Sequence, residues 1–77
     1  MKEFIEFIAK YLVDSTDKVI VEEKADEEKK ITLTLRVKQD DVGKVIGKKG
    51  RTALAMRTLL TAVAAKEGKR ATLDILD

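Results

Sequence analysis

One segment of this 77-residue chain sets two lysines between two glycines: Val45-Ile46-Gly47-Lys48-Lys49-Gly50-Arg51. Glycine tolerates positive φ angles, so a glycine on each side of Lys48-Lys49 indicates a sharp turn that a ligand backbone can approach closely. A helix that begins near Gly50 would point its free N–H groups and the positive end of its dipole out of the loop. With the two lysine charges added, the segment predicts a phosphate-binding site.

The residues before this loop predict a strand and a short helix. Apolar and polar residues alternate over residues 31–38, which is typical of a strand with one buried face. A helix of about two turns should follow, with Asp40 or Asp41 as its N-cap and Gly47 at its end. This helix carries Val42, Val45 and Ile46.

The residues after the loop predict a long helix and a closing strand. Residues 51–66 are rich in strong helix formers, and Gly68 should end the helix. A strand is then expected over residues 71–76. The predicted buried stripe of the long helix consists of Ala53, Met56, Leu59, Leu60 and Val63.

The N-terminal part of the chain predicts a helix followed by a hairpin. Apolar spacings of three and four indicate a helix over residues 2–13, with its three aromatic side chains in the core. A short strand is expected over residues 18–23 and a charged turn over residues 25–30. The predicted order of elements is therefore α-β-β-α-α-β, an α+β fold. The three aromatic residues are Phe4, Phe7 and Tyr11.

Length and composition limit the function. Seventy-seven residues allow one small domain, 1–77. The chain has no cysteine and no histidine, which excludes Ser-His-Asp and Cys-His enzymes and removes the commonest metal ligands. We therefore expect no enzyme activity, no metal and no cofactor. No apolar run is long enough to span a membrane, and acidic residues interrupt the N-terminal segment, so a cytoplasmic location is expected.

Charge is unevenly distributed along the chain. Residues 1–28 contain four lysines and nine acids, a net charge of −5, whereas residues 29–77 contain twelve basic residues and five acids, a net charge of +7. A polyanion partner for the C-terminal half fits this distribution, although solvated surface lysines would give the same count.

Two other interpretations of the glycine–lysine loop fit the sequence less well. A nucleotide P-loop needs Gly-x-x-x-x-Gly-Lys-Ser/Thr directly after a strand. The segment that begins at Gly43 is one residue short of that spacing, and Lys49 stands where the metal-binding hydroxyl must be. A plain helix–loop–helix corner needs one glycine cap, and it does not need two lysines between two glycines.

The segment Ile46-Gly47-Lys48-Lys49-Gly50 between two helices resembles the hallmark loop of KH domains. The order of elements is similar to the type II, prokaryotic arrangement, and the resemblance covers essentially the whole chain. It implies a three-stranded mixed sheet with three helices packed on one face. It also implies that the loop clamps the backbone of about four single-stranded nucleotides.

The resemblance also suggests which residues contact RNA. Two glycines allow close approach of the RNA backbone, and nearby cations pair with its phosphates. Apolar side chains form the floor of a groove, although at least one of them should belong to the core instead. Arg57 is expected at the rim of the groove. The predicted RNA-binding residues are Gly43, Lys44, Val45, Ile46, Gly47, Lys48, Lys49, Gly50, Arg51, Ala53 and Arg57.

Residues 41–60 resemble more specifically the KhpA family of stand-alone bacterial KH proteins. This resemblance implies a single-stranded RNA-binding protein that acts as an RNA chaperone or post-transcriptional regulator. It implies a role in cell length and peptidoglycan homeostasis. It also implies a homodimer or a heterodimer with a KhpB-like protein. The alternative function is a dimerisation or scaffold subunit for a larger KH-containing partner.

Overall fold

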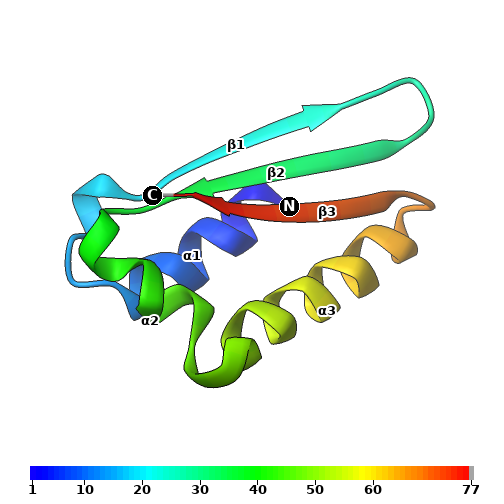
Figure 1. The fold of residues 1–77 in the computed structure, drawn as a ribbon. Coiled ribbons are helices and arrows are strands. Elements are labelled where there is room, and N and C mark those ends of the chain that lie inside the picture. The colour runs from blue at the N-terminus through cyan, green and yellow to red at the C-terminus, as the bar shows by residue number, and fades with distance from the viewer. Residues whose placement is uncertain (77) are drawn as a thin grey trace.

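The computed structural model describes residues 1–76, which form three α-helices and a three-stranded sheet (Figure 1). The predicted α-β-β-α-α-β order is confirmed. The helices are α1 (Lys2–Leu12), α2 (Val42–Ile46) and α3 (Arg51–Lys66), and the strands are β1 (Ile20–Ala25), β2 (Lys30–Arg36) and β3 (Arg70–Leu76). Short 3₁₀ turns occupy Thr16–Lys18, Gln39–Asp41 and Lys48–Gly50.

The sheet is mixed, with β2 at its centre. β1 pairs with β2 in antiparallel fashion, from Ile20 opposite Arg36 to Ala25 opposite Ile31. β3 lies on the other side of β2 and runs parallel to it, with Leu33 opposite Leu73. The mixed sheet that the resemblance implied is therefore confirmed, and β3 is left as an edge strand.

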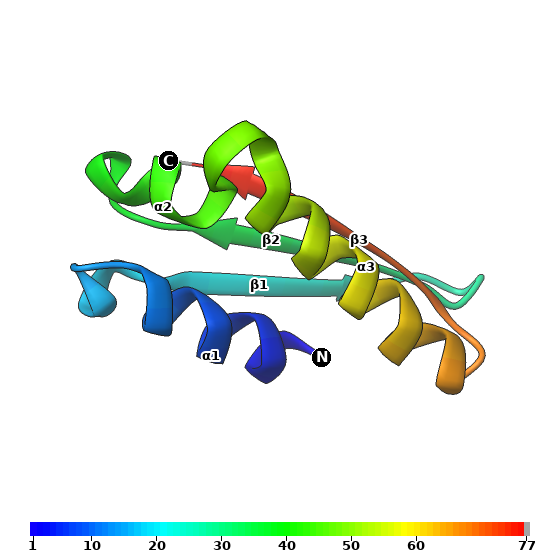
Figure 2. The same cartoon turned by 90° about the horizontal axis from the view of Figure 1, so that it is seen from below.

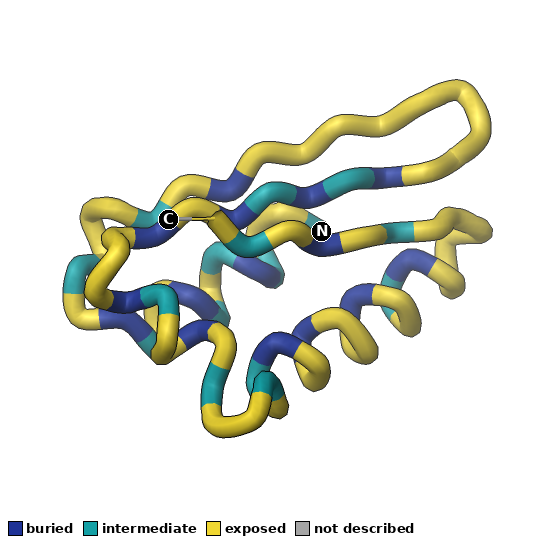
Figure 3. The backbone as a smooth tube through the Cα atoms, in the orientation of Figure 1, coloured by how far each residue is buried: buried dark blue, intermediate teal, exposed yellow. Residues whose placement is uncertain are grey.

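All three helices cover one face of the sheet (Figures 1 and 2). Viewed from the helix side, α1 lies toward β1, whereas α2 and the first turns of α3 lie toward β3 (Figure 2). The alternation predicted for β2 is confirmed, because Ile31, Leu33 and Leu35 are buried and the residues between them are only partly buried. Figure 3 shows this alternation as changes of colour along β2. The opposite face of β2 carries threonines and an arginine toward solvent.

Element boundaries differ from the prediction where 3₁₀ turns intervene. The first strand begins at Ile20 rather than residue 18, because Thr16–Lys18 forms a turn. The second strand ends at Arg36, since Gln39–Asp41 already turns toward α2. The strand expected over residues 71–76 begins one residue earlier, at Arg70.

The prediction that all three aromatic residues lie in the core is wrong for two of them. Tyr11 is 83% exposed and Phe7 is 71% exposed, whereas Phe4 packs against the core. The buried residues of α1 are Ile5 and Ala9. At 100° per residue, Phe7 lies about 200° around the helix from Ile5, and Tyr11 lies as far from Ala9. Both aromatic rings therefore point away from the sheet.

The buried stripe of α3 also differs from the prediction. Ala53, Met56, Leu60 and Ala64 face the sheet. Leu59 is half exposed, and Val63 is only partly buried. The stripe follows steps of three and four residues that end at Ala64, so the small Ala64 takes the place predicted for Val63.

Among residues 1–76, no helix is long and apolar enough to cross a membrane.

Candidate functional site

The glycine–lysine loop joins the end of α2 to the start of α3. Gly47, with φ of 77° and ψ of 173°, ends α2, and its N–H donates to the carbonyl of Gly43 at 2.9 Å. The 3₁₀ turn Lys48–Gly50 follows, closed by the N–H of Gly50 on the carbonyl of Gly47 at 3.1 Å. The loop is thus a tight, hydrogen-bonded corner at the β3 side of the molecule (Figure 2).

Gly47 is the glycine that this corner requires. A Cβ at this position would lie 2.2 Å from Thr52 Oγ1 and 2.6 Å from Thr52 Cβ. Its positive φ also lies in the region that side chains disfavour. Sequence reasoning named this glycine but not Thr52, whose side chain fills the inside of the corner.

The chain continues through two left-handed residues. Lys49 has φ of 57° and ψ of 27°, and Gly50 has φ of 71° and ψ of 12°. A non-glycine residue in this region costs about 1–2 kcal/mol. The loop nevertheless has lysine at position 49, with its side chain exposed.

The start of α3 is electropositive. Gly50 is the N-cap residue, no side chain caps the helix, and the first turn contains no acid. The first N–H groups of this 16-residue helix therefore have no capping side chain as a partner. The charges of Lys48, Lys49 and Arg51 are exposed beside them, and none of the three takes part in an ion pair within residues 1–76.

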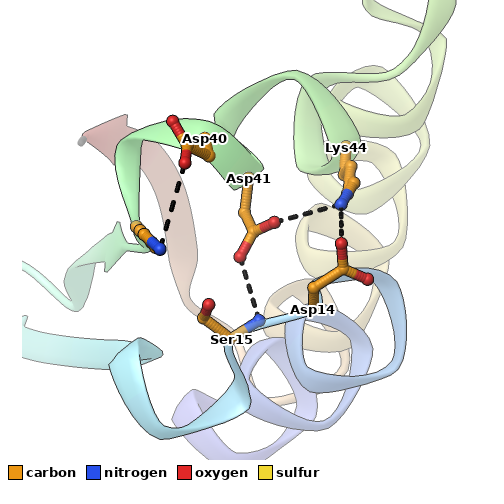
Figure 4. Close-up of polar contacts among 6 residues, drawn as sticks. Asp14, Ser15, Asp40, Asp41 and Lys44 are labelled. Carbon is orange, nitrogen blue, oxygen red and sulfur yellow. Dashed lines mark hydrogen bonds and ion pairs between the residues drawn. The ribbon is translucent and has the colours of Figure 1, made fainter.

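Lys44 differs from these three cations, although the sequence grouped it with them. Its Nζ contacts both Asp14 Oδ2 and Asp41 Oδ1, the latter at 3.2 Å (Figure 4). Two carboxylates thus already neutralise its charge. Sequence reasoning missed this contact because Asp14 lies 30 positions earlier in the chain.

Asp41 links the segment after α1 to the start of α2. Its side chain is only 3% exposed, and its Oδ2 accepts the N–H of Ser15 at 3.1 Å (Figure 4). The pKa of Asp41 is lowered, first by the Ser15 hydrogen bond and then by Lys44. The pKa of Lys44 is raised by its bonds to Asp14 and Asp41. Asp41 is the N-cap residue of α2, as predicted, but its side chain makes no cap bond and contacts Ser15 and Lys44 instead.

The predicted groove floor divides into core and surface. Val45 is completely buried and Ala53 nearly so, so their side chains lie beneath the site rather than on it. Sequence reasoning expected at least one of the three apolar residues of α2 in the core, and that residue is Val45. Ile46 is partly exposed, and Gly43 is exposed with open space around its Cα.

Arg57 lies farther along α3, beside the edge strand. Its Nε donates to the carbonyl oxygen of Leu73 in β3 at 3.2 Å. A cleft of about 250 Å³ lies here between α3 and β3. Sequence reasoning expected Arg57 at the rim of a groove, but it did not name the other residues that line this cleft. The cleft is lined by Arg57, Leu60, Thr61, Ala71, Thr72 and Leu73.

A short helix, a Gly-x-x-Gly loop and a long helix set against a three-stranded sheet define the class of KH domains. Comparison with known families gives the particular family. The family model described as KhpA/KhpB, KH domain matches residues 2–75, and the chain belongs to this family.

Curated relatives resemble the chain over nearly its whole length. A protein of Aquifex aeolicus is 51% identical over 77 residues, which cover 100% of this chain and 96% of the relative. A protein of Borreliella burgdorferi is 55% identical over 75 residues, which cover 97% of this chain and 90% of the relative. Both are named RNA-binding protein KhpA. No solved structure gives a significant match.

The family is one of binding domains, in agreement with the prediction that the chain is not an enzyme. Within residues 1–76, no three potential ligands from Asp, Glu, His or Cys gather where they could hold a metal ion.

Proposed function

We propose that this protein, acting as one KH domain over residues 1–77, binds single-stranded RNA by clamping its backbone at the loop Gly47–Gly50. The observation that carries the proposal is the set of three exposed cations at the start of α3 that form no ion pair with residues 1–76. The N–H of Arg51 donates to the carbonyl of Lys48, so phosphate would accept hydrogen bonds from the N–H groups that follow it in the first turn of α3. Phosphate would also pair with the charges of Lys48, Lys49 and Arg51.

The backbone of the loop supports this proposal. Gly50, whose Cβ position is open space, leaves room for a nucleic-acid backbone, whereas the absence of a side chain at Gly47 makes room for Thr52. Lys49 holds a left-handed conformation that glycine would adopt without strain. A lysine is kept there at a cost in stability, which is understandable if its charge is needed. The relatives named RNA-binding proteins agree with RNA as the ligand.

The predicted site residues take different parts in this proposal. Gly43, Ile46 and Arg57 contact the part of the RNA chain that extends beyond the loop. Val45 and Ala53 hold the two helices from beneath. Lys44 positions α2 through its ion pairs with Asp14 and Asp41 instead of pairing with phosphate.

The test is RNA affinity measured by fluorescence anisotropy on a mixed-sequence, single-stranded RNA pool. Lys48→Asp with Lys49→Asp should abolish binding, whereas the secondary structure seen by circular dichroism stays unchanged because both side chains are exposed. The matched control is Lys18→Asp with Lys24→Asp, which changes net charge equally at exposed positions far from the loop along the chain. Equal losses in both variants would contradict a localised clamp.

We also propose the finer role that the family resemblance implies, a cytoplasmic RNA chaperone or post-transcriptional regulator that affects cell length and peptidoglycan homeostasis. A domain that grips four nucleotides holds RNA weakly and reversibly, as strand rearrangement requires. An annealing assay with two complementary RNAs tests this role. Acceleration that disappears in the Lys48→Asp, Lys49→Asp variant supports it, and no acceleration by the wild type contradicts it.

A second candidate function is dimerisation, and the exposed aromatic pair of α1 favours it. Phe7 and Tyr11 flank an apolar hollow of about 210 Å³ together with Ile8 and Leu12. Exposed aromatic clusters are typical of interfaces. We propose that a second copy of the chain occupies this face, because one patch used by both copies closes a two-fold dimer.

Sedimentation of the protein measures its oligomeric state. Phe7→Ser with Tyr11→Ser should give a monomer, whereas Leu54→Ser with Leu59→Ser, on the exposed side of α3, should leave the dimer intact. A monomeric wild type that associates only with a KhpB-like protein would replace the homodimer by the heterodimer. If only the α3 substitutions dissociated the dimer, the proposal that α1 forms the interface would be contradicted.

A further inference from the structure

The two loop lysines lie in a long stretch of the chain that contains no acidic residue, residues 42–66. The side chains of Lys48 and Lys49 are exposed, and neither forms an ion pair within residues 1–76. Their amines are therefore open to a small anion, which no paired carboxylate would repel. Four other lysines do form ion pairs, namely Lys10, Lys38, Lys44 and Lys69.

Arg51 adds a third cation to these two amines. Its side chain is exposed and, like the lysines, forms no ion pair with another residue of the range 1–76. Gly50 separates Lys49 from Arg51, and even a Cβ at this glycine would meet open space. A guanidinium group binds two phosphate oxygens at once. While Arg51 holds a phosphate, a lysine amine beside it remains free to react with a group attached to that phosphate.

We propose that acyl phosphates acylate Lys48 and Lys49 at this loop and thereby release RNA. The proposal rests on RNA binding at the loop and names a chemical regulator of that same site. An acyl phosphate combines an anionic phosphate with a reactive carbonyl carbon in one small molecule. Its phosphate end is the group that the loop cations bind, and its carbonyl end is the group that a lysine amine attacks.

The reaction transfers the acyl group from phosphate to nitrogen. The neutral form of a lysine amine attacks the carbonyl carbon, and a C–N bond forms. The C–O bond to phosphate breaks, its electron pair stays on the phosphate oxygen, and the amine proton leaves with the phosphate. With acetyl phosphate the products are acetyl-lysine and hydrogen phosphate. Holding the phosphate beside the amine should make this step faster at the loop than at other lysines.

Acylation would remove the charges that the RNA clamp uses. An acylated lysine carries no charge, so each modification takes away one phosphate contact. When both lysines are modified, Arg51 alone remains of the three loop cations. RNA affinity should therefore fall, and the slope of log affinity against log salt should become shallower by about 0.7 for each modified lysine.

The experiment treats the wild type with acetyl phosphate and measures the acetylation rate of each lysine by mass spectrometry. Lys18 and Lys24 are the internal comparison, because both are exposed and form no ion pair within residues 1–76, but acidic residues directly precede them in the chain. The loop lysines should react about tenfold faster than these two, since a cluster of cations concentrates an anion locally. This advantage should shrink as salt is added. N-acetoxysuccinimide, an uncharged acetylating reagent, should modify all four lysines at similar rates.

Arg51→Gln tests the phosphate contact directly. The variant keeps both loop lysines, so their advantage with acetyl phosphate should fall, whereas their reaction with N-acetoxysuccinimide should not change. Arg70→Gln is the matched control, because Arg70 is exposed and follows the end of α3 that is remote from the loop (Figure 1). Its selectivity should equal that of the wild type. An undiminished advantage in Arg51→Gln would overturn the proposal.

The RNA affinity of the acetylated protein separates this inference from the clamp. A loss of affinity that follows the extent of acetylation at the loop supports both. Equal acetylation of the loop lysines and of Lys18 and Lys24, with RNA binding still lost in the Lys48→Asp, Lys49→Asp variant, would leave the clamp standing and refute selective acylation. Loop-selective acetylation without any loss of RNA affinity would overturn the proposed release of RNA and contradict the clamp itself.

Discussion

Gly47 is the residue on which the geometry of the loop depends most. Gly47→Ala would bring a Cβ into contact with Thr52 at a positive φ, so we expect the free energy of unfolding to fall by about 1–3 kcal/mol. Gly43→Ala is the matched control, since its Cβ would meet open space within α2 and should stabilise the helix by about 0.5–1 kcal/mol. Chemical denaturation measures both. Equal stability of the two variants would show that the corner tolerates a side chain.

Asp41 should make stability depend on pH. Its pKa is lowered in the folded protein, so its contribution is present above the ordinary pKa of aspartate and is lost as pH falls through the lower, folded value. The melting temperature of the wild type should therefore fall on acidification. The Asp41→Asn variant should have a lower melting temperature than the wild type at neutral pH. Its melting temperature should fall less on acidification, because the buried carboxylate is gone.

Asp40→Asn is the control for this titration. The Asp40 side chain is exposed, and its carboxylate lies 3.9 Å from Lys38, so its removal should change the pH profile little. An Asp41→Asn profile parallel to that of the wild type would contradict a role for this carboxylate.

At the scale of elements, the sequence predicted periodic features better than contacts. The alternation over β2 identified its buried residues, because a strand has only two faces. Apolar spacing defines less well which side of an amphipathic helix is buried. Tyr11 was placed in the core because it lies three residues after Ile8, but this spacing also fits a residue at the exposed edge of the apolar stripe. The ion pair of Lys44 with Asp14 could not be predicted, because it depends on how the segment after α1 meets α2 in space. The loop itself was predictable because positive φ angles restrict residue choice.

The packing of α3 gives a prediction of its own. Leu60 is 1% exposed, so Leu60→Ala should lower the free energy of unfolding by about 2–5 kcal/mol. Leu59 is 50% exposed, and Leu59→Ala should cost less than about 1 kcal/mol. The two substitutions remove the same atoms from adjacent positions, and thermal melting compares them directly. A larger loss for Leu59→Ala than for Leu60→Ala would contradict this placement of the buried stripe.

At the scale of the whole molecule, charge and fold are arranged together. The acidic segment 1–28 supplies α1 and β1, whereas the basic segment 29–77 supplies the loop, α3 and β3. Because α1 lies toward β1 and the loop lies toward β3 (Figure 2), opposite sides of the molecule differ in charge. This separation should orient a polyanion toward the loop and away from α1.

The salt dependence of RNA affinity tests the clamp most directly. The three loop cations, which pair with no carboxylate in the described part of the chain, predict a slope of log affinity against log salt of about −2, from roughly −0.7 for each phosphate of a single strand. Lys49→Gly removes one charge and keeps a backbone that the loop accepts, so the slope should become shallower by about 0.7. A wild-type slope near zero, or an unchanged slope in Lys49→Gly, would contradict phosphate clamping by this loop.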